Sequence, residues 1–365
     1  MIDIFQPDYD TTDCVVVTYA LKAKTNLAEA SKAIAFGQSI GNPTMRSQWE
    51  TVELWENFAC RILATEASLT SSTIGLVKIA WPKFTLNPIR AGVSQLLCCI
   101  AGGLVDIEEI LGCHIVNLEL PKTNCHPAFG MSGTRKFTDC YDRPLLGGIL
   151  KPKTGLSLGQ MADMVKAMID GGVNVIKDDE ILGCQGILDR MDVLSPILEG
   201  TKVIYIACIN SDSNHITTVQ PWIPNIGVHI NVWSGLGTYR AVRQYHKKTF
   251  IHFQKSGDRF FTLASNNFCI RWPVLCQIAI WSGVDSIHAG MWGGYLHTPE
   301  LETLIPYLNA YNVIPFLSCG MTPDKVAPIR EKFGNDWLAN VGGYIHSYSG
   351  GTTAGVQAMR KALDE

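Results

Sequence analysis

The sequence Val173-Asn174-Val175-Ile176-Lys177-Asp178-Asp179-Glu180 changes abruptly from apolar to charged residues. A near-continuous apolar run is typical of a strand buried on both faces of a parallel sheet. A strand that ends in Lys-Asp-Asp-Glu places an amine and several carboxylate oxygens at one point in space. Mg²⁺ takes one or two carboxylates together with waters and substrate oxygens. The stretch therefore indicates a magnesium site at a strand end, and a surface ion cluster is the alternative for this motif alone.

Similar apolar runs recur from about residue 144 onward, and helical segments such as 158–169, 300–312 and 352–363 separate them. Eight such units over roughly 220 residues are the count and length of a (β/α)₈ TIM barrel. A doubly wound open sheet would alternate similarly, but eight units reaching nearly to residue 365 favour closure. The predicted strands are residues 144–150, 173–177, 203–207, 228–232, 250–253, 284–288, 313–317 and 337–341.

The first part of the chain has a different pattern. It is predicted to contain strands at residues 14–21, 73–79 and 115–120, helices at 27–37 and 91–100, and a connection at 123–138. The fold class predicted is therefore α/β, with an N-terminal α+β domain (residues 1–135) followed by a C-terminal (β/α)₈ barrel that carries the catalytic site (residues 136–365).

Composition excludes several classes of function. Of the 365 residues, 47% are hydrophobic and 17% charged, and the net charge is −3. No basic patch dominates, so nucleic acid is not an expected partner. No signal peptide is visible at the N-terminus, and no apolar run reaches the roughly 18 residues that cross a bilayer. The twelve cysteines lack CxxC spacing, as expected of buried thiols in a reducing compartment. A cytoplasmic protein without nucleic-acid or membrane partners is expected.

Polar residues gather where the predicted strands end, which is the rim where barrel enzymes build their sites. Taken singly, each has a structural interpretation: His288 as a hydrogen-bonded core histidine, the glycine pair as a turn, Lys153 as an ion-pair partner. Their succession at strand ends favours a site. The candidate residues are Lys151, Lys153, Lys177, Asp179, Glu180, His252, His288, Ser318, Gly320, Gly342 and Gly343.

Several stretches resemble the RuBisCO large-chain superfamily. Residues 142–157 (DRPLLGGILKPKTGLS) resemble its first barrel strand and loop, and residues 171–180 (GGVNVIKDDE) resemble the strand with its metal ligands. Residues 285–290 (DSIHAG) resemble its sixth strand, and Leu317-Ser318-Cys319-Gly320 and Gly342-Gly343 resemble its phosphate-binding loops. The resemblance spans essentially the whole chain, is strongest from about residue 140, and is closest to RuBisCO-like proteins of the form IV type.

The resemblance implies a role for each candidate. Lys177 would react with CO₂ to form a carbamate that binds Mg²⁺ together with Asp179 and Glu180. Carbamylation needs a neutral amine, and burial lowers the pKa of a lysine whereas nearby carboxylates raise it. The resemblance further implies Lys151 as base or acid, His252 and His288 in proton transfer or phosphate contact, and a phosphate site at Lys153, Ser318, Gly320, Gly342 and Gly343. A homodimer, or a multiple of dimers, is also implied.

The chain departs from the carboxylase pattern at several positions. Tyr295 stands where a carboxylase has a lysine on its mobile sixth loop, and a phenol supplies no permanent cation. Phe253 stands where the family has an arginine for the second phosphate, although Lys255 or Arg259 could substitute. Gln38 and Gly103 are aligned with the family's N-terminal glutamate and asparagine, and residues 346–349 (HSYS) replace a Gly-His-Pro.

These departures predict a Mg²⁺-dependent RuBisCO-like enolase or isomerase. It would abstract a proton next to the carbonyl of a phosphorylated ketose, through a metal-bound enediolate, in thiosugar salvage or sugar-acid breakdown. The alternatives are an authentic ribulose-bisphosphate carboxylase, a decarboxylase or hydrolase of a phosphorylated 3-oxo sugar acid, and a non-catalytic regulatory or assembly relative. The sequence names neither the substrate nor the product.

Overall fold

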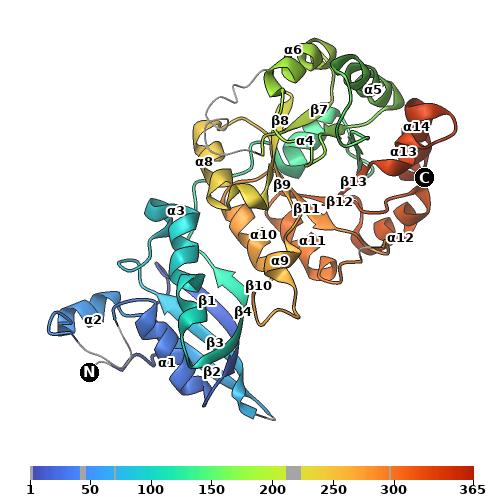
Figure 1. The fold of residues 1–365 in the computed structure, drawn as a ribbon. Coiled ribbons are helices and arrows are strands. Elements are labelled where there is room, and N and C mark those ends of the chain that lie inside the picture. Colours follow the sequence, from blue (N-terminus) through green and yellow to red (C-terminus); the bar gives the residue numbers. More distant parts are fainter. Residues whose placement is uncertain (1–2, 42–46, 70, 211–222, 296) are drawn as a thin grey trace. The chain divides into compact units, whose positions relative to one another are not determined.

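A computed structural model describes residues 3–41, 47–69, 71–210, 223–295 and 297–365. The chain forms two compact units (Figure 1). The first unit comprises Met1–Asn124 and Asp258–Trp281, and the second comprises Cys125–Gly257 and Ser282–Glu365. The chain therefore divides about ten residues before the expected boundary at residue 135, and it contributes a second, later segment to the first unit.

The second unit is the predicted barrel. Its eight parallel strands close in the order β11-β12-β13-β5-β6-β7-β8-β9, and β13 pairs with β5 through Leu338 and Leu145. The strands are β5 (Leu145–Ile149), β6 (Val175–Lys177), β7 (Ile204–Cys208), β8 (Ile226–Asn231), β9 (Ile251–Gln254), β11 (Ser286–Gly290), β12 (Ile314–Leu317) and β13 (Leu338–Val341). All eight predicted strands are present, and the (β/α)₈ fold is confirmed.

Helices surround this ring of strands (Figure 1). Helix α5 shows how the sequence sets their limits: Ser157 and Gln160 form a capping box at its start, and Gly172 ends it in the left-handed region at φ 94°. The helices of this unit are α4 (Gly130–Thr138), α5 (Leu158–Gly171), α6 (Ile187–Leu198), α8 (Gly237–Tyr245), α11 (Leu301–Ala310), α12 (Pro323–Phe333), α13 (Gly343–His346) and α14 (Gly351–Asp364).

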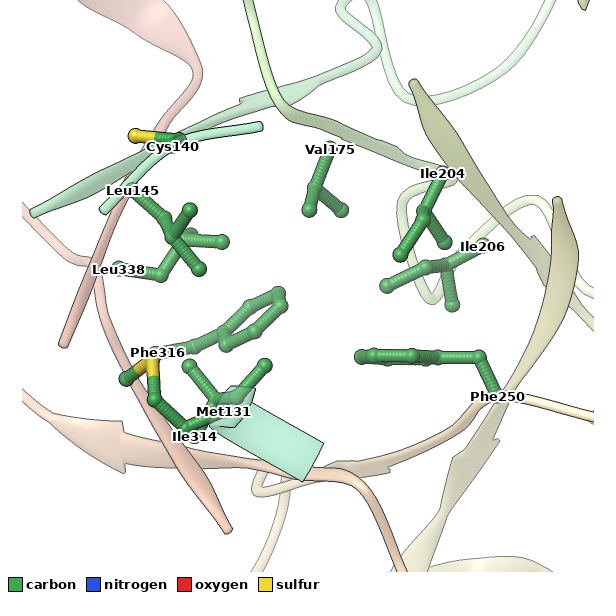
Figure 2. Close-up of a cluster of buried hydrophobic side chains, with 10 residues drawn as sticks. All are labelled: Met131, Cys140, Leu145, Val175, Ile204, Ile206, Phe250, Ile314, Phe316 and Leu338. Carbon is green, nitrogen blue, oxygen red and sulfur yellow. The ribbon is translucent and has the colours of Figure 1, made fainter. Parts of the chain in front are cut away.

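Apolar side chains fill the barrel at the end where its strands begin. Figure 2 shows these side chains pointing toward one another inside the ring of strands. Met131 comes from α4, so the segment expected as a plain connection contains a helix that contributes to this core. Burying one such side chain stabilises the fold by about 1.5–3 kcal/mol. The cluster contains Met131, Cys140, Leu145, Val175, Ile204, Ile206, Phe250, Ile314, Phe316 and Leu338.

One buried carboxylate fixes the start of α4. The side chain of Asp285, which is 0% exposed, accepts hydrogen bonds from the backbone N–H groups of Phe129 (2.6 Å), Gly130 (3.0 Å) and Ile251 (2.7 Å). It also forms an ion pair of 2.6 Å with Arg243 of α8. Asp285 thus joins α4 and α8 to the strands β9 and β11.

The first unit is built on a sheet of order β10-β4-β1-β3-β2, antiparallel except where β10 joins β4 in parallel. The strands β1, β3 and β4 and the helices α1 and α3 were expected, whereas α2, β2 and β10 were not. Its elements are β1 (Val15–Ala23), α1 (Leu27–Gly37), α2 (Val52–Phe58), β2 (Arg61–Ser68), β3 (Ser71–Trp81), α3 (Pro88–Leu97), β4 (Ile110–Glu119), α9 (Arg259–Thr262), β10 (Phe268–Ile270) and α10 (Trp272–Trp281).

Backbone pairing explains why Asp258–Trp281 belongs to the first unit. Strand β10 pairs with β4, with Phe268 opposite Cys113. Helix α10 continues the contact, because Gln277 accepts a hydrogen bond of 3.1 Å from the backbone of Leu118 and Trp281 donates one of 2.9 Å to the carbonyl of Pro121. The segment between β9 and β11 thus completes the N-terminal sheet.

Within the described residues, the segment Pro88–Asp106 is long and apolar enough to cross a membrane by length and composition alone, contrary to the expectation from the sequence. It is not one regular helix, because the backbone leaves the helical region at Gly92 (φ 79°, ψ −174°) and the segment ends in a π turn and a 3₁₀ turn. Tyr19 of β1 donates a hydrogen bond of 2.8 Å to the carbonyl of Ile100, so the segment is tied to the sheet.

Candidate active site

A cavity of about 470 Å³ opens at the carboxyl end of the barrel strands. Ten of the eleven candidate residues line it, whereas His252 lies below it and is fully buried. The loops that follow β5, β6, β11, β12 and β13 all contribute to the lining, as expected of the rim of a barrel. The candidates at the cavity are Lys151, Lys153, Lys177, Asp179, Glu180, His288, Ser318, Gly320, Gly342 and Gly343.

The two aspartates of the Lys-Asp-Asp-Glu stretch have different surroundings. Asp178 is 0% exposed and pairs with Arg190 of α6 at 3.1 Å. It also accepts hydrogen bonds from the hydroxyl of Tyr205 and from the backbone N–H of Cys208 at 2.8 Å. Asp178 therefore anchors the loop after β6 to α6 and β7. Of the two aspartates, Asp179 is the one that lines the cavity.

Lys177 is the last residue of β6, and its amine is buried. Its Nζ donates a hydrogen bond of 2.8 Å to the carbonyl of Asp178 and lies 3.3 Å from Nδ1 of His229 on β8. Burial lowers the pKa of Lys177, and the nearby charge of Glu180 opposes this shift. A lowered pKa raises the share of neutral amine, which is the form that reacts with CO₂.

Several donors orient the two carboxylates at the cavity. Asp179 pairs with Nζ of Lys151 and accepts a hydrogen bond of 3.1 Å from the backbone N–H of Ile181. Glu180 accepts hydrogen bonds from the hydroxyl of Ser256 (2.7 Å) and from the amide of Gln254 (3.4 Å). Burial would raise the pKa of Glu180, but the charge of Lys177 and the bond from Ser256 outweigh it and hold this pKa below its ordinary value.

The donor set fits a hard divalent cation once one more anionic ligand is added. Across the described ranges, no group of three or more His, Cys, Asp or Glu side chains is arranged to hold a metal ion. Asp179 and Glu180 supply two carboxylates, each with lone pairs beyond those used by the donors described above. A carbamate on Lys177 would supply the third anionic group, and oxygen ligands of this kind suit Mg²⁺.

A chain of hydrogen bonds lies beneath the cavity. His252 Nδ1 lies 2.8 Å from the hydroxyl of Ser286, and His252 Nε2 lies 3.2 Å from the amide oxygen of Gln254. His288 Nδ1 lies 3.3 Å from the amide nitrogen of Gln254, and His288 Nε2 lies 2.9 Å from the hydroxyl of Ser318. His252 thus belongs to the layer that supports the cavity and not to its wall.

Burial keeps the histidines around this layer neutral. It lowers the pKa of His288 to about 3, with help from the positive charges of Lys255 and Lys177. Burial also places the pKa values of His252 and His229 well below the ordinary range. Imidazolium at these positions is therefore strongly disfavoured at neutral pH.

Glycine-rich turns form another part of the cavity wall. Gly320 has φ 102°, and a side chain there would come within 3.0 Å of the ring of Tyr295. Gly342 lies beside Lys151, so a Cβ would stand 3.2 Å from Cε of this lysine. Gly343 begins α13, which is only four residues long, and the longer helix α14 starts at Gly351. The helix that begins at this part of the wall is therefore a single short turn.

Phe253 faces away from the cavity. Successive residues of a strand point to opposite sides, so His252 and Gln254 point into the barrel and Phe253 points outward. Its ring is fully buried and stacks on Tyr239 of α8 with the centroids 4.6 Å apart. The side chain at this position therefore packs a helix against the barrel.

We expect Phe253→Arg to destabilise the barrel and not to create a second phosphate site. A guanidinium facing α8 would be buried without a partner, and the stacking on Tyr239 would be lost; such changes cost about 3–5 kcal/mol. Urea unfolding measures the loss, and Phe253→Leu serves as the matched control that keeps the site apolar. A stable variant with raised affinity for a bisphosphate would contradict the assignment.

The remaining departures concern Tyr295, two positions of the first unit and residues 346–349. Tyr295 is 83% exposed and lines the cavity. In the first unit, Gln38 accepts a hydrogen bond of 3.4 Å from the backbone N–H of Gly103, so the structure brings these two positions together. His346 bonds to the carbonyl of Ile149 at 2.9 Å and thereby ties α13 to the end of β5.

No sequence motif points to Gln254, Ser256 or His229. Each is polar but follows no recognised motif, and each lies on or next to a predicted strand. The alternation of side chains along β9 could have indicated Gln254, because a residue two positions after His252 points to the same side of the strand. The contacts of Ser256 with Glu180 and of His229 with Lys177 depend on the closed barrel.

The chain is similar to known proteins along most of its length. The family model "Ribulose bisphosphate carboxylase large chain, catalytic domain" matches residues 130–310. A ribulose bisphosphate carboxylase of Methanocaldococcus jannaschii is 28% identical over 397 aligned positions, which cover 97% of this chain and 91% of the relative. A 2,3-diketo-5-methylthiopentyl-1-phosphate enolase of Exiguobacterium sibiricum is 27% identical, with coverage of 96% and 92%.

The solved structures show the same fold. The octameric ribulose-1,5-bisphosphate carboxylase/oxygenase of Pyrococcus horikoshii superposes with a TM-score of 0.86 over 99% of this chain and 90% of that protein, at 23% identity. The sequence relatives of this chain include one named as a carboxylase and one named as an enolase. By its catalytic-domain match and its relatives over nearly the whole length, the chain belongs to the RuBisCO large-chain superfamily.

Proposed function

We propose that this chain is a Mg²⁺-dependent RuBisCO-like enolase or isomerase, which abstracts a proton next to the carbonyl of a phosphorylated ketose. The observation that carries the proposal is one cavity lined by lysine amines, two carboxylates and glycine turns. A phosphate bound at the glycine turns would direct the sugar carbons toward Lys151, Asp179 and Glu180. The proposal is supported by two relatives, one named as a ribulose bisphosphate carboxylase and one named as an enolase of a phosphorylated diketone.

We assign Lys177, as its carbamate, together with Asp179 and Glu180 to the metal. Bound Mg²⁺ would act as a Lewis acid toward the substrate carbonyl. Ser256 and Gln254 orient Glu180 toward the cavity, whereas Ile181 orients Asp179. The protein thus holds the carboxylates before the substrate arrives.

We assign proton transfer to Lys151. Its amine is paired with Asp179, so it must leave this carboxylate before it reaches a substrate carbon. His288 and His252 are poor candidates for the base. Burial lowers their pKa values far below neutral pH, so their imidazoles bind a proton too weakly to act as the base. Lys153, Ser318, Gly320, Gly342 and Gly343 would bind the phosphate.

Tyr295 and Phe253 favour enolisation over carboxylation. Tyr295 offers no permanent positive charge at the loop position where the family's carboxylases have lysine. Phe253 packs on Tyr239 and leaves no cation for a second phosphate at this position. A ketose with one phosphate therefore fits the cavity better than a bisphosphate. We further propose a homodimer or a multiple of dimers, in line with the octameric relative.

Exchange of the α-hydrogen of ketose phosphates for solvent deuterium tests the proposal directly. We expect exchange that requires Mg²⁺ and CO₂ and that stops when EDTA removes the metal. The panel should include keto-sugar monophosphates and a 2,3-diketo phosphate, with ribulose 1,5-bisphosphate and ¹⁴CO₂ as the carboxylase arm. Fixation of ¹⁴CO₂ without monophosphate exchange would replace the proposal by the carboxylase alternative, and no exchange with any substrate would favour a non-catalytic relative.

We expect Ser256→Ala to weaken Mg²⁺ binding by about 10–100-fold, the usual cost of losing a residue that orients a metal ligand. Glu180 would lose the 2.7 Å hydrogen bond that fixes one of its oxygens. Isothermal titration with Mg²⁺ in the presence of CO₂ measures the change. Ser347→Ala, which removes an exposed hydroxyl just after α13, is the control and should leave the affinity unchanged. Equal affinities of both variants and the native protein would refute the role of Ser256.

A further inference from the structure

Gln254 is the last residue of β9, is buried, and connects three residues of the site through one amide group. Its Nε2 lies 3.4 Å from Oε2 of Glu180 and 3.3 Å from Nδ1 of His288. Its Oε1 lies 3.2 Å from Nε2 of His252. One amide thus contacts a proposed metal ligand and two histidines.

The chemistry of these partners fixes the orientation of the amide. A carboxylate accepts hydrogen bonds and donates none, so the NH₂ group of Gln254 must face Glu180. The amide oxygen therefore faces His252, whose Nε2 must carry a hydrogen. The other ring nitrogen of neutral His252 then has a lone pair, which accepts the hydroxyl hydrogen of Ser286 at 2.8 Å. Both bonds of His252 are thereby satisfied.

The second hydrogen of the amide determines the tautomer of His288. It points to Nδ1, which must present a lone pair, so Nε2 of neutral His288 carries the hydrogen and donates it to Ser318 at 2.9 Å. We propose that Gln254 is a positioning residue that fixes both His252 and His288 as Nε2–H tautomers, so that His288 donates a hydrogen bond to Ser318. The hydroxyl of Ser318 also lies 3.8 Å from Sγ of Cys319, a weak acceptor, so its hydrogen can turn to a ligand oxygen in the cavity.

The Nε2–H tautomer of His288 distinguishes this site from the active site of a serine hydrolase. There, the histidine accepts the serine hydrogen at Nε2 while an acidic partner holds Nδ1–H. Here the amide donor at Nδ1 gives the reverse arrangement, so Ser318 is a hydrogen-bond donor for substrate oxygen and not an activated nucleophile. Only the use of Ser318 by a phosphorylated substrate rests on the proposed function; the tautomers are a property of the protein alone.

Two-bond ¹H–¹⁵N correlation spectra of [¹⁵N]histidine-labelled full-length protein test the proposal. Loss of signals in His252→Asn and His288→Asn assigns the two rings. We expect a protonated Nε2 and an unprotonated Nδ1 for both. Protonation of Nδ1 in His288 of the native protein would overturn the proposal whatever the outcome of the exchange assays.

Two variants of Gln254 test its causal role. In Gln254→Glu at mildly alkaline pH, the new carboxylate accepts from both rings, so His288 should switch to Nδ1–H while His252 keeps Nε2–H. In Gln254→Met, which has a similar size and no donor, His288 should lose its single tautomer. Gln244→Glu, the same change at an exposed site on α8, is the control and should change neither ring. Unchanged His288 signals in both Gln254 variants would show that Gln254 does not set the tautomer.

Discussion

Lys177→Met should reduce deuterium exchange into the substrate by at least about 10²-fold, the loss expected when one electrostatic stabiliser of a transition state is removed. Methionine cannot form a carbamate, so the cavity would have only Asp179 and Glu180 as anionic metal ligands. The same change should leave the protein as stable as before or more stable, because an apolar side chain of similar length replaces a buried amine. Activity and stability are thus expected to change in opposite directions.

Three measurements check this expectation. Exchange is measured with Mg²⁺ and CO₂ present, unfolding by urea denaturation, and the carbamate by ¹³C spectra after addition of ¹³CO₂. Lys166→Met, at an exposed position of α5, is the matched control and should keep both the exchange rate and the carbamate signal. Full exchange activity in Lys177→Met, or a carbamate signal equal to that of the native protein, would show that Lys177 is not the carbamylated ligand.

Asp285→Ala should lower the free energy of unfolding of the barrel by about 3–5 kcal/mol, the cost of leaving a buried charge without its partner. The substitution strands the guanidinium of Arg243 and removes the acceptor of three backbone N–H groups, two of which lie at the start of α4. Because Met131 of α4 is part of the core at that end of the barrel, the loss should spread into the core. Urea unfolding measures it, and hydrogen exchange should show early opening of Phe129 and Gly130.

Glu302→Ala is the control for Asp285→Ala. It removes an ion pair of 2.7 Å with Lys332 in which both side chains are about half exposed, and pairs of this kind contribute about 0–1 kcal/mol. Both variants lose one carboxylate of the same unit. Similar unfolding free energies for the two would mean that Asp285 does not hold α4 and α8 to the strands.

The sequence predicted the barrel well because each strand is a short apolar run that ends at polar residues. This signal is local: Val175 to Lys177 can be recognised without knowing its neighbours. The same pattern placed ten candidates at one cavity, since parallel strands of a barrel end on the same side. The barrel fold and the location of the site at the carboxyl ends of its strands could therefore be predicted from the sequence alone.

The parts that the sequence did not predict depend on partners far along the chain. Strand β10 has three residues, and only its pairing with β4 assigns it to the N-terminal sheet. Gln254 and Ser256 acquire their roles through Glu180, more than seventy residues away. His252 was placed at the cavity because it stands at a strand end, whereas it lies one layer deeper, where Gln254 and Ser286 bind it.

Strand β10 lies far along the chain from its partner β4 and is therefore synthesised much later, which has a consequence for folding during translation. A ribosome that has released residues up to Asn124 has made β1 to β4 but not the strand that covers the outer edge of β4, and the contact between His114 and Asn266 spans 152 residues. The nascent N-terminal sheet must keep this edge exposed while five barrel strands are synthesised, and an open edge of this kind invites pairing with other chains. Chaperone demand should therefore peak in the middle of translation and fall once Ile270 has emerged.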